Sequence, residues 1–487
     1  MPIFSESIYL KYMVWHKRFF ALLLVLLPTQ LGVHFWPDWA MVLGRRVDYL
    51  SPTVYLTDML LLVTLSSWLL ESFPRIRNPF DMAQGRQESA RLPVRQGIRK
   101  KQNMLTSFII PFLVFVGLNV FVAHNQYVAV YKWLKVAEFV GLGWYIVRTR
   151  PKLSAISYPL SVGIFYSSVL AIVQFFFQHS IGGPLWWIGE RTFDAGTPGI
   201  ARIDSCQLSA FSCQQFLRSY ATFPHPNVLG GFLAVTLPLL LNLRIYESTN
   251  LPMDERMRRM VQWGLGITMV LGVIALILSF SRSAMVVGGV AIVLAIARIT
   301  NFKFQIMEHK INFPPFILYT LLVILLLTVF VKTDLREESI AVRQQLNSAA
   351  VKLWQSSPLL GVGLGNFLVR LPEALSTRTI YFLQPVHNIY LLVLAETGVV
   401  GVGLIVLWIA LQSQKWRVHS VKKNKKKIYS EFFTLHSSLI TLLLLGLVDH
   451  YPLTLQQGQL LLTLLVAMSL REVREVRDVQ KVREVKK

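Results

Sequence analysis

Charged residues are scarce in this chain. Of its 487 residues, 15% are Asp, Glu, Lys or Arg, while 53% are hydrophobic and the mean hydropathy is +0.49. Soluble globular domains carry about a quarter charged residues. The composition therefore excludes an ordinary soluble domain and predicts a protein whose main solvent is lipid.

Cysteine is almost absent, and so are the common metal and nucleotide motifs. Cys206 and Cys213 are too few for a disulfide framework, and no histidine cluster near them indicates a zinc site. One disulfide between them becomes possible if their loop lies outside the cytoplasm. The chain has no Asp-x-Asp pair, no Walker loop and no His-Glu-x-x-His. We therefore expect no metal and no other cofactor.

Positive charge is the one kind of charge that the chain has in excess. The net charge of +23 would suggest nucleic acid in a soluble protein, but here the basic residues lie between apolar stretches of membrane-spanning length. We interpret the excess as a topology signal and expect membrane lipids, not nucleic acid, around the protein.

The apolar stretches predict an all-α, polytopic membrane protein of about 12 transmembrane helices. Most of these stretches approach the ~20 residues that span a bilayer. The first lacks a small-residue cleavage site, so we expect a retained helix and not a removable signal. The expected helices are 19–36, 55–70, 105–123, 128–147, 159–177, 229–243, 261–279, 284–297, 313–331, 389–411, 432–448 and 453–470.

The distribution of lysine and arginine predicts the orientation, because basic loops stay in the cytoplasm. With the N-terminus inside, the inner segments hold most of the 49 basic residues, so both termini are expected to be cytoplasmic. Two outer loops are too long for simple connectors and are therefore expected to be functional. The expected parts are helices 1–5 in 1–177, an outer loop 178–228, helices 6–9 in 229–331, a large outer loop 332–388, helices 10–12 in 389–470 and a basic tail 471–487.

Three arginines are expected at or near the outer ends of helices. Arg218 precedes the sixth helix, Arg282 lies in the turn between the seventh and eighth, and Arg343 lies in the large outer loop. Guanidinium groups keep their charge and bind phosphate oxygens in a bidentate fork, which suits a diphosphate without a metal ion. The alternative is an interfacial arginine that extends to lipid headgroups.

Histidine supplies the candidate proton acceptor. His387 opens the tenth helix, and an imidazole with a pKa near neutrality accepts a proton from an attacking hydroxyl. His225, and the pair Asp449 and His450 at the outer end of the eleventh helix, are competing sites. The run around His225 also reads as a helix entry with Asn227 as its N-cap.

A charged stripe within the fourth helix adds secondary candidates. Lys132, Lys135 and Glu138 repeat at three-residue spacing, so they share one helix face. They either neutralise one another or line a substrate groove, since charges inside a bilayer usually face a cavity.

Two glycine patterns are interpreted as structural. Gly361, Gly363 and Gly365 lack the preceding strand of a nucleotide-binding loop and predict a turn. Gly398, Gly401 and Gly403 predict close helix packing.

Several motifs together resemble the O-antigen ligase and O-antigen polymerase superfamily of bacterial envelope glycosyltransferases. They are RSYATFPHPNVLGGFL from residue 218, SFSRSA from 279, a long outer loop ending in SPLLGVGLGNF, and HNIYLLVLAETGVVGVGL from 387. The resemblance covers about 218–404. The histidine in FPHPN departs from the pattern of many relatives, which leaves His225 open between function and packing.

The resemblance implies a metal-independent transfer at the periplasmic face of the bacterial inner membrane. A saccharide would pass from an undecaprenyl-diphosphate carrier to a hydroxyl of a glycan, lipid or protein acceptor. Arg218, Arg282 and Arg343 would hold the diphosphate and His387 would be the base. The residues do not separate a ligase, a polymerase and a protein O-glycosyltransferase.

A protein of another class also fits twelve helices with buried charges, namely a lipid-linked saccharide flippase or another multi-helix transporter. Charges spread along a central pathway would favour transport, whereas a cluster at one face favours transfer. The sequence places its candidates at one face. It also shows no internal repeat, so an inverted-repeat transporter has no direct support.

The predicted orientation is open to a labelling test. Single-cysteine reporters at Gln84 and Asn424 should be protected from an impermeant thiol reagent, while one at Ser376 should react, because the first two lie in basic inner loops. Protection at Ser376 together with reaction at Gln84 would reverse the topology.

Overall fold

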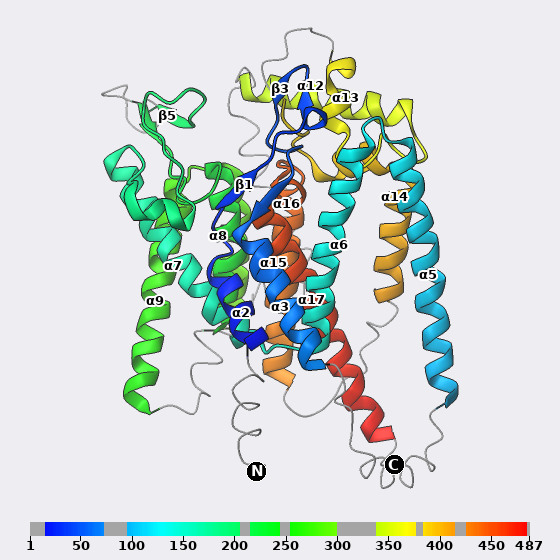
Figure 1. The fold of residues 1–487 in the computed structure, drawn as a ribbon. Helices are drawn as coiled ribbons and strands as arrows, with labels where there is room; N and C mark the ends of the chain where they lie inside the picture. Colours follow the sequence, from blue (N-terminus) through cyan, green and yellow to red (C-terminus); the bar gives the residue numbers. More distant parts are fainter. Residues whose placement is uncertain are drawn as a thin grey trace, which may run out of the picture.

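The computed structural model describes residues 15–72, 95–204, 215–243, 254–299, 338–375, 383–413 and 425–484. These residues are mostly helical (Figure 1). The long helices are α2 (Trp15–Val25), α3 (Leu56–Ser72), α5 (Arg95–Val122), α6 (Gln126–Thr149), α7 (Leu153–Phe177), α8 (Pro226–Asn242), α9 (Glu255–Leu278), α10 (Arg282–Ile299), α12 (Glu338–Ser356), α14 (Ile389–Ser413), α15 (Lys425–Leu445) and α17 (Gln456–Glu484).

Short elements lie between the helices. The strands form three two-stranded antiparallel sheets: β1 (Gly32–His34) with β4 (Thr53–Tyr55), β2 (Met41–Val42) with β3 (Arg45–Arg46), and β5 (Arg202–Asp204) with β6 (Gln215–Leu217). The short helices are η1 (Asp38–Ala40), η3 (Gly183–Ile188), α13 (Phe367–Ala374) and α16 (Tyr451–Thr454). The expectation of a purely helical chain is corrected by these strands.

Length and composition support membrane spans for part of the bundle. Among the described residues, three helices are long and apolar enough to cross a membrane, namely α7, α9 and α14, and five shorter apolar helices accompany them. The expected ninth helix at 313–331, Cys206 and Cys213 lie outside the described residues. The count of twelve spans therefore stays a prediction.

The first expected helix is shorter than predicted. Helix α2 ends at Val25, and the apolar run continues through a turn at Pro28 into β1, although 19–36 was expected to be one span. Proline has no N–H and fixes its own φ, so it favours the end of a helix. The threonine that follows, Thr29, directs its hydroxyl to Ile188 O at 2.5 Å and so ties the turn to the loop after α7.

Helix α8 occupies the centre of the bundle. It packs against α7, α9, α10 and α15, and its side chains from Val228 to Leu241 are buried on all sides. The segment carries no charge, so this complete burial leaves no ion without a partner. Gly288 of α10 permits close approach, since a Cβ there would lie 2.6 Å from Ala234 Cβ. The rigid α8 fixes the position of the loop at its N-terminus.

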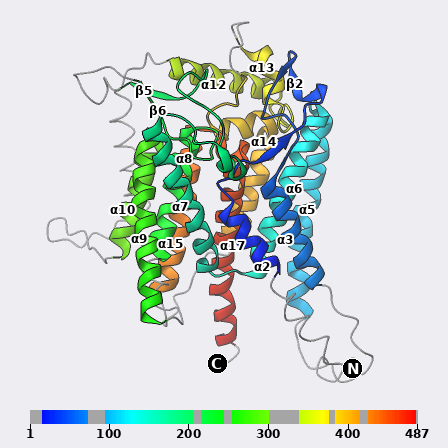
Figure 2. The ribbon, with the colours of Figure 1, turned by 60° about the vertical axis from the view of Figure 1, so that its left-hand side comes forward.

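A second layer covers one end of the bundle. Helices α12 and α13 lie across the upper end in Figures 1 and 2, where α12 packs against α13 and α14. Buried Leu346, Leu353, Phe367 and Leu371 form a separate apolar core there with the β2–β3 region. Because this core also includes Val128 of α6 and Leu392 of α14, the cap is packed directly onto the ends of these helices.

The glycine prediction is confirmed for the turn and only in part for helix packing. A Cβ at Gly401 would lie 2.9 Å from Phe115 of α5, but one at Gly403 would meet nothing within 4 Å. Gly361, Gly363 and Gly365 all adopt positive φ, in a turn that runs past the kink of α14. Gly398 forms that kink with φ +62 and ψ −171, in close contact with the backbone of Leu359. Only glycine reaches these conformations without strain. The kink and the turn fix the loop that leads from α12 to α13.

Candidate functional site

A chain of hydrogen bonds joins three of the sequence motifs. The Nε of Arg218 donates to Ser279 O at 2.8 Å, and its Nη2 donates to Asn227 Oδ1 at 2.7 Å. Asn227 Nδ2 in turn donates to Asp449 Oδ2 at 3.3 Å. Residues far apart in the sequence are therefore fixed to one another at the end of the bundle that the cap covers.

The start of α8 holds Asn227 in this chain. His225 is the N-cap, because its Nδ1 accepts the Asn227 N–H at 3.1 Å, and Pro226 occupies the first helical position. The expected N-cap was Asn227 itself; the structure corrects this to His225. The amide of Asn227 is thereby left to bridge Arg218 and Asp449.

His387 faces the carboxylate of Asp449. Its Nδ1 lies 3.8 Å from Asp449 Oδ1, within ion-pair range but too long for a hydrogen bond. The imidazole rings of His387 and His450 lie 4.9 Å apart between centroids. The structure thus brings together the predicted base and the pair that the sequence offered as a competing site.

Electrostatics keep Asp449 ionised. Burial by itself would raise the pKa of this carboxyl, but the contact with His387 and the nearby His450 and His225 outweigh burial and hold the pKa well below its usual range. A carboxylate in this position stabilises positive charge on a neighbouring imidazole.

His450 is held neutral, because burial lowers its pKa to about 3 despite the opposing charge of Asp449. The hydroxyl of Thr454 donates to His450 O at 3.1 Å, so its oxygen accepts from His450 Nδ1 at 2.6 Å. His450 therefore carries its proton on Nδ1 and leaves Nε2 as a lone pair.

His387, Asp449 and His450 also have the chemistry of metal ligands. One ligand atom from each lies within 4.8 Å of the others. Imidazole nitrogen and carboxylate oxygen are ligands that zinc accepts. The expectation of a site without metal must therefore be tested with chelator.

Arg218 is embedded in the protein with positive charge around it. Burial lowers its pKa to about 10; the phenol of Tyr220 opposes this effect, whereas the charge of Arg282 adds to it. Asp449 and Arg343 act on the same guanidinium with smaller and opposite effects. Arg218 still stays protonated at neutral pH, and the three predicted arginines lie within electrostatic reach of one another.

A cavity of about 520 Å³ adjoins this cluster. His225, His387, Asp449 and His450 line it, whereas Arg218, Arg282 and Arg343 are not among its lining residues. Other walls are aromatic or amide-bearing: Tyr49, Tyr55, Tyr131, Gln30, Gln384, Gln456 and Gln459. The cations that line it are Arg191, Lys132 and Lys135, of which Arg191 was not predicted from the sequence.

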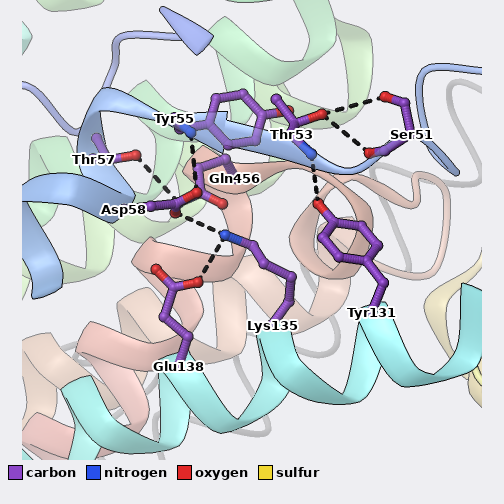
Figure 3. A network of polar contacts seen from close by, with 9 residues as sticks. All are labelled: Ser51, Thr53, Tyr55, Thr57, Asp58, Tyr131, Lys135, Glu138 and Gln456. Carbon is purple, nitrogen blue, oxygen red and sulfur yellow. Dashed lines mark hydrogen bonds and ion pairs between the residues drawn. The ribbon is translucent and has the colours of Figure 1, made fainter. Parts of the chain in front are cut away.

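The predicted charged stripe divides into two parts. Figure 3 shows Lys135 between two carboxylates, with Nζ 2.7 Å from Asp58 Oδ1 and 2.8 Å from Glu138 Oε2. Asp58 also accepts from Tyr55 N at 3.0 Å and from the amide of Gln456. Lys135 and Glu138 thus neutralise one another, with Asp58 as a third member of the cluster. This is one of the two alternatives that the sequence predicted.

Asp58 and Arg191 could not be selected from the sequence. Asp58 opens an apolar helix, where an acidic residue in the first turn is ordinary. Arg191 lies in an exposed loop and donates weakly to Pro224 O at 3.5 Å. Arg191 lines the cavity, whereas Asp58 contacts Lys135, which lines it. The only sequence signal for Asp58 was a carboxylate inside an apolar run.

These features define a class: a mostly helical protein with helices apolar and long enough to cross a membrane, and a polar cavity at the capped end of its bundle. Within that class, residues 267–421 match the family model described as O-antigen ligase. The match supports membership of the superfamily that the motifs resemble. The matched region includes Arg282, Arg343 and His387.

The family match suggests a membrane protein of glycosyltransferase type that acts in polysaccharide biosynthesis, with a lipid-linked glycan donor and an acceptor. None of the curated proteins compared with the chain matches it.

The neutral state of His450 predicts a pH dependence of stability. Between about pH 6.5 and about pH 3 the unfolded chain binds a proton at this residue that the folded chain does not. The contribution to stability is thus fully present above pH 6.5 and is lost as pH falls. His450→Gln should lose less thermal stability than the parent protein between pH 7.5 and pH 5, measured as the apparent unfolding midpoint in detergent.

His179→Gln is the control, since it removes an imidazole from the exposed loop after α7. An unchanged pH profile in His450→Gln would contradict the neutral, buried state of His450.

Proposed function

We propose that this protein transfers a saccharide from an undecaprenyl-diphosphate carrier to an acceptor hydroxyl, with the reaction centred on His387. The observation that carries the proposal is the convergence of His387, Asp449 and Arg218 beside one cavity through contacts between separate motifs. The match to the O-antigen ligase family model supports it. A cluster at one end of the bundle also favours transfer over transport along a central pathway.

His387 is the proposed general base. Its Nδ1 faces Asp449, so Nε2 is the atom left to take the proton from the acceptor hydroxyl. The acceptor oxygen then attacks the anomeric carbon, and the bond from that carbon to the diphosphate breaks with its electron pair on the diphosphate. Asp449 stabilises the imidazolium that forms and holds its orientation.

The arginines are the proposed partners of the leaving diphosphate. Arg218 is fixed by two hydrogen bonds, and the charges of Arg282 and Arg343 reach the same guanidinium. Three cations so close together create a positive potential that stabilises charge developing on the leaving group. Because they do not line the cavity, the diphosphate is proposed to sit at its edge, beside the turn between α9 and α10.

Replacing His387 with alanine should abolish transfer, because no other group takes the acceptor proton. Asp449→Asn should reduce the rate less completely, by roughly 10²- to 10⁴-fold, since the base remains but its charged orienting partner is lost. Transfer is measured with purified protein and a defined undecaprenyl-diphosphate-linked donor, alongside donor binding.

Donor binding should survive in His387→Ala, which serves to separate catalysis from folding. His436→Ala, a histidine of α15 that does not line the cavity, is the matched control and should transfer normally. Near-parental transfer by His387→Ala would refute the base assignment and move it to His450 or His225.

Arg282→Lys should cut transfer severely with little loss of folded protein, because lysine keeps one charge but loses the bidentate fork. Activity of the parent protein should also persist in EDTA, since arginines and not a metal are proposed to stabilise the diphosphate. Loss of activity on chelation, restored by a divalent cation, would instead assign a metal to His387, Asp449 and His450.

A further inference from the structure

Two lysines one turn apart on α6 line the same cavity but differ in their partners. Lys135 contacts two carboxylates at 2.7 and 2.8 Å. Among the described residues Lys132 forms no ion pair; its Nζ lies 5.2 Å from the centroid of the Tyr131 ring, and Glu396 acts on it only at longer range. A lysine within an apolar helix that lacks a carboxylate partner and borders a cavity has the chemistry of an anion ligand.

The capping loop holds the stem of Lys132 in place. A Cβ at Gly365 would lie 2.6 Å from Lys132 Cγ and 2.9 Å from Val128 Cγ1, so the loop backbone packs directly on the aliphatic part of the side chain. Glu396 forms no ion pair with this ammonium among the described residues, and its Oε1 accepts the Phe367 N–H at 3.2 Å at the start of α13. Fixing the stem reduces the entropy lost when the ammonium binds a ligand.

The surroundings of Lys132 match those of a bound saccharide. Tyr55, Tyr131, Gln456 and Gln459 line the same cavity. The Nε2 of Gln456 is bound to Asp58 and Thr57, whereas its Oε1 is a buried acceptor without a hydrogen-bond partner among the described residues. Aromatic rings pack against the apolar faces of sugar rings, while amides pair with hydroxyls. Of the two lysines that line the cavity, Lys135 is neutralised by carboxylates, so the ammonium of Lys132 adds recognition of a negative charge to this polar and aromatic surface.

We infer that Lys132 forms a subsite for an acidic group, a carboxylate or a phosphate, on the substrate that occupies this cavity. The inference rests on the proposed function, because it takes the occupant of the cavity to be a glycan substrate. It assigns Lys132 a role distinct from those of Arg218, Arg282 and His387. The acidic group has two possible sources, the glycan itself or the diphosphate of the carrier.

Binding to the purified full-length protein in detergent tests the subsite, with three probes measured by calorimetry. Cellobiouronic acid carries a carboxylate, cellobiose is its neutral counterpart, and inorganic pyrophosphate represents the carrier headgroup. Lys132→Met should weaken binding of an anionic probe by roughly 10- to 100-fold and leave cellobiose unchanged, because it removes one charge-assisted contact. Lys132→Arg should restore most of the affinity.

Lys152→Met is the matched control, because it makes the same substitution at an exposed position before α7. Loss confined to cellobiouronic acid assigns the acidic group to the glycan, and loss confined to pyrophosphate assigns it to the carrier. Equal weakening of cellobiose and the anions, or no change in either anion, overturns the subsite.

His387→Ala separates this inference from the proposed reaction. It should bind all three probes as the parent protein does, because the base need not contact them. If it still transfers saccharide, the reaction centre is wrong while the subsite stands; if Lys132→Met binds every probe normally, the subsite is wrong while the reaction centre stands.

Discussion

The cost of leaving a charge without a partner in an apolar bundle is the constraint on which the site depends. Lys135 is tolerated inside α6 because Asp58 and Glu138 neutralise it directly. Arg218 is tolerated because a backbone carbonyl and the Asn227 amide accept its N–H groups. In a low-dielectric interior such partners are required, since an isolated ion there loses several kcal/mol of hydration. The requirement ties helices together wherever a charge is kept.

The same constraint explains why the reacting residues meet. Arg218 needs acceptors and finds Ser279 at the end of α9 and Asn227 at the start of α8. The free side of that asparagine then reaches Asp449, and Asp449 reaches His387. The three hydrogen bonds satisfy polar groups of Arg218, Asn227 and Asp449, whereas Asp449 meets His387 Nδ1 as a charge at 3.8 Å. Such networks hold functional groups with a precision that isolated contacts lack.

Hydropathy along the sequence could predict the apolar helices, but it could not predict where they end or the cap formed by α12 and α13. Ten of the expected helices overlap long described helices, because each apolar run has its own length and flanks, but their ends differ: α5 begins at Arg95 where 105 was expected, and α17 ends at Glu484 where 470 was expected. The run at 19–36 failed because one proline outweighs local hydropathy, and α12 and α13 were missed because their apolar faces pack on a cap and not on lipid.

Sequence motifs selected His387 and the arginines as separate candidates, whereas the contacts between them depend on tertiary structure. Nothing in the sequence indicates that Asn227 bridges Arg218 to Asp449, because 222 positions separate the asparagine from the aspartate. The sequence also presented His225 and the Asp449–His450 pair as rivals of His387. In the structure they are its surroundings: His225 caps α8, and Asp449 faces the imidazole. Spacing along the chain cannot show whether another histidine replaces His387 as the base or lies beside it.

The two kinds of positive charge at this end of the bundle suit two different tasks. Arg218 is already hydrogen-bonded and has other arginines nearby, so in the proposed reaction it acts mainly through its electrostatic field, which stabilises negative charge as it develops on the leaving group. Lys132 has no carboxylate partner among the described residues and borders the cavity, so it can contact a ground-state ligand directly. A fixed field lowers the barrier without binding the substrate more tightly, whereas a direct contact changes affinity. Separating them allows donor activation and substrate choice to vary independently on one scaffold.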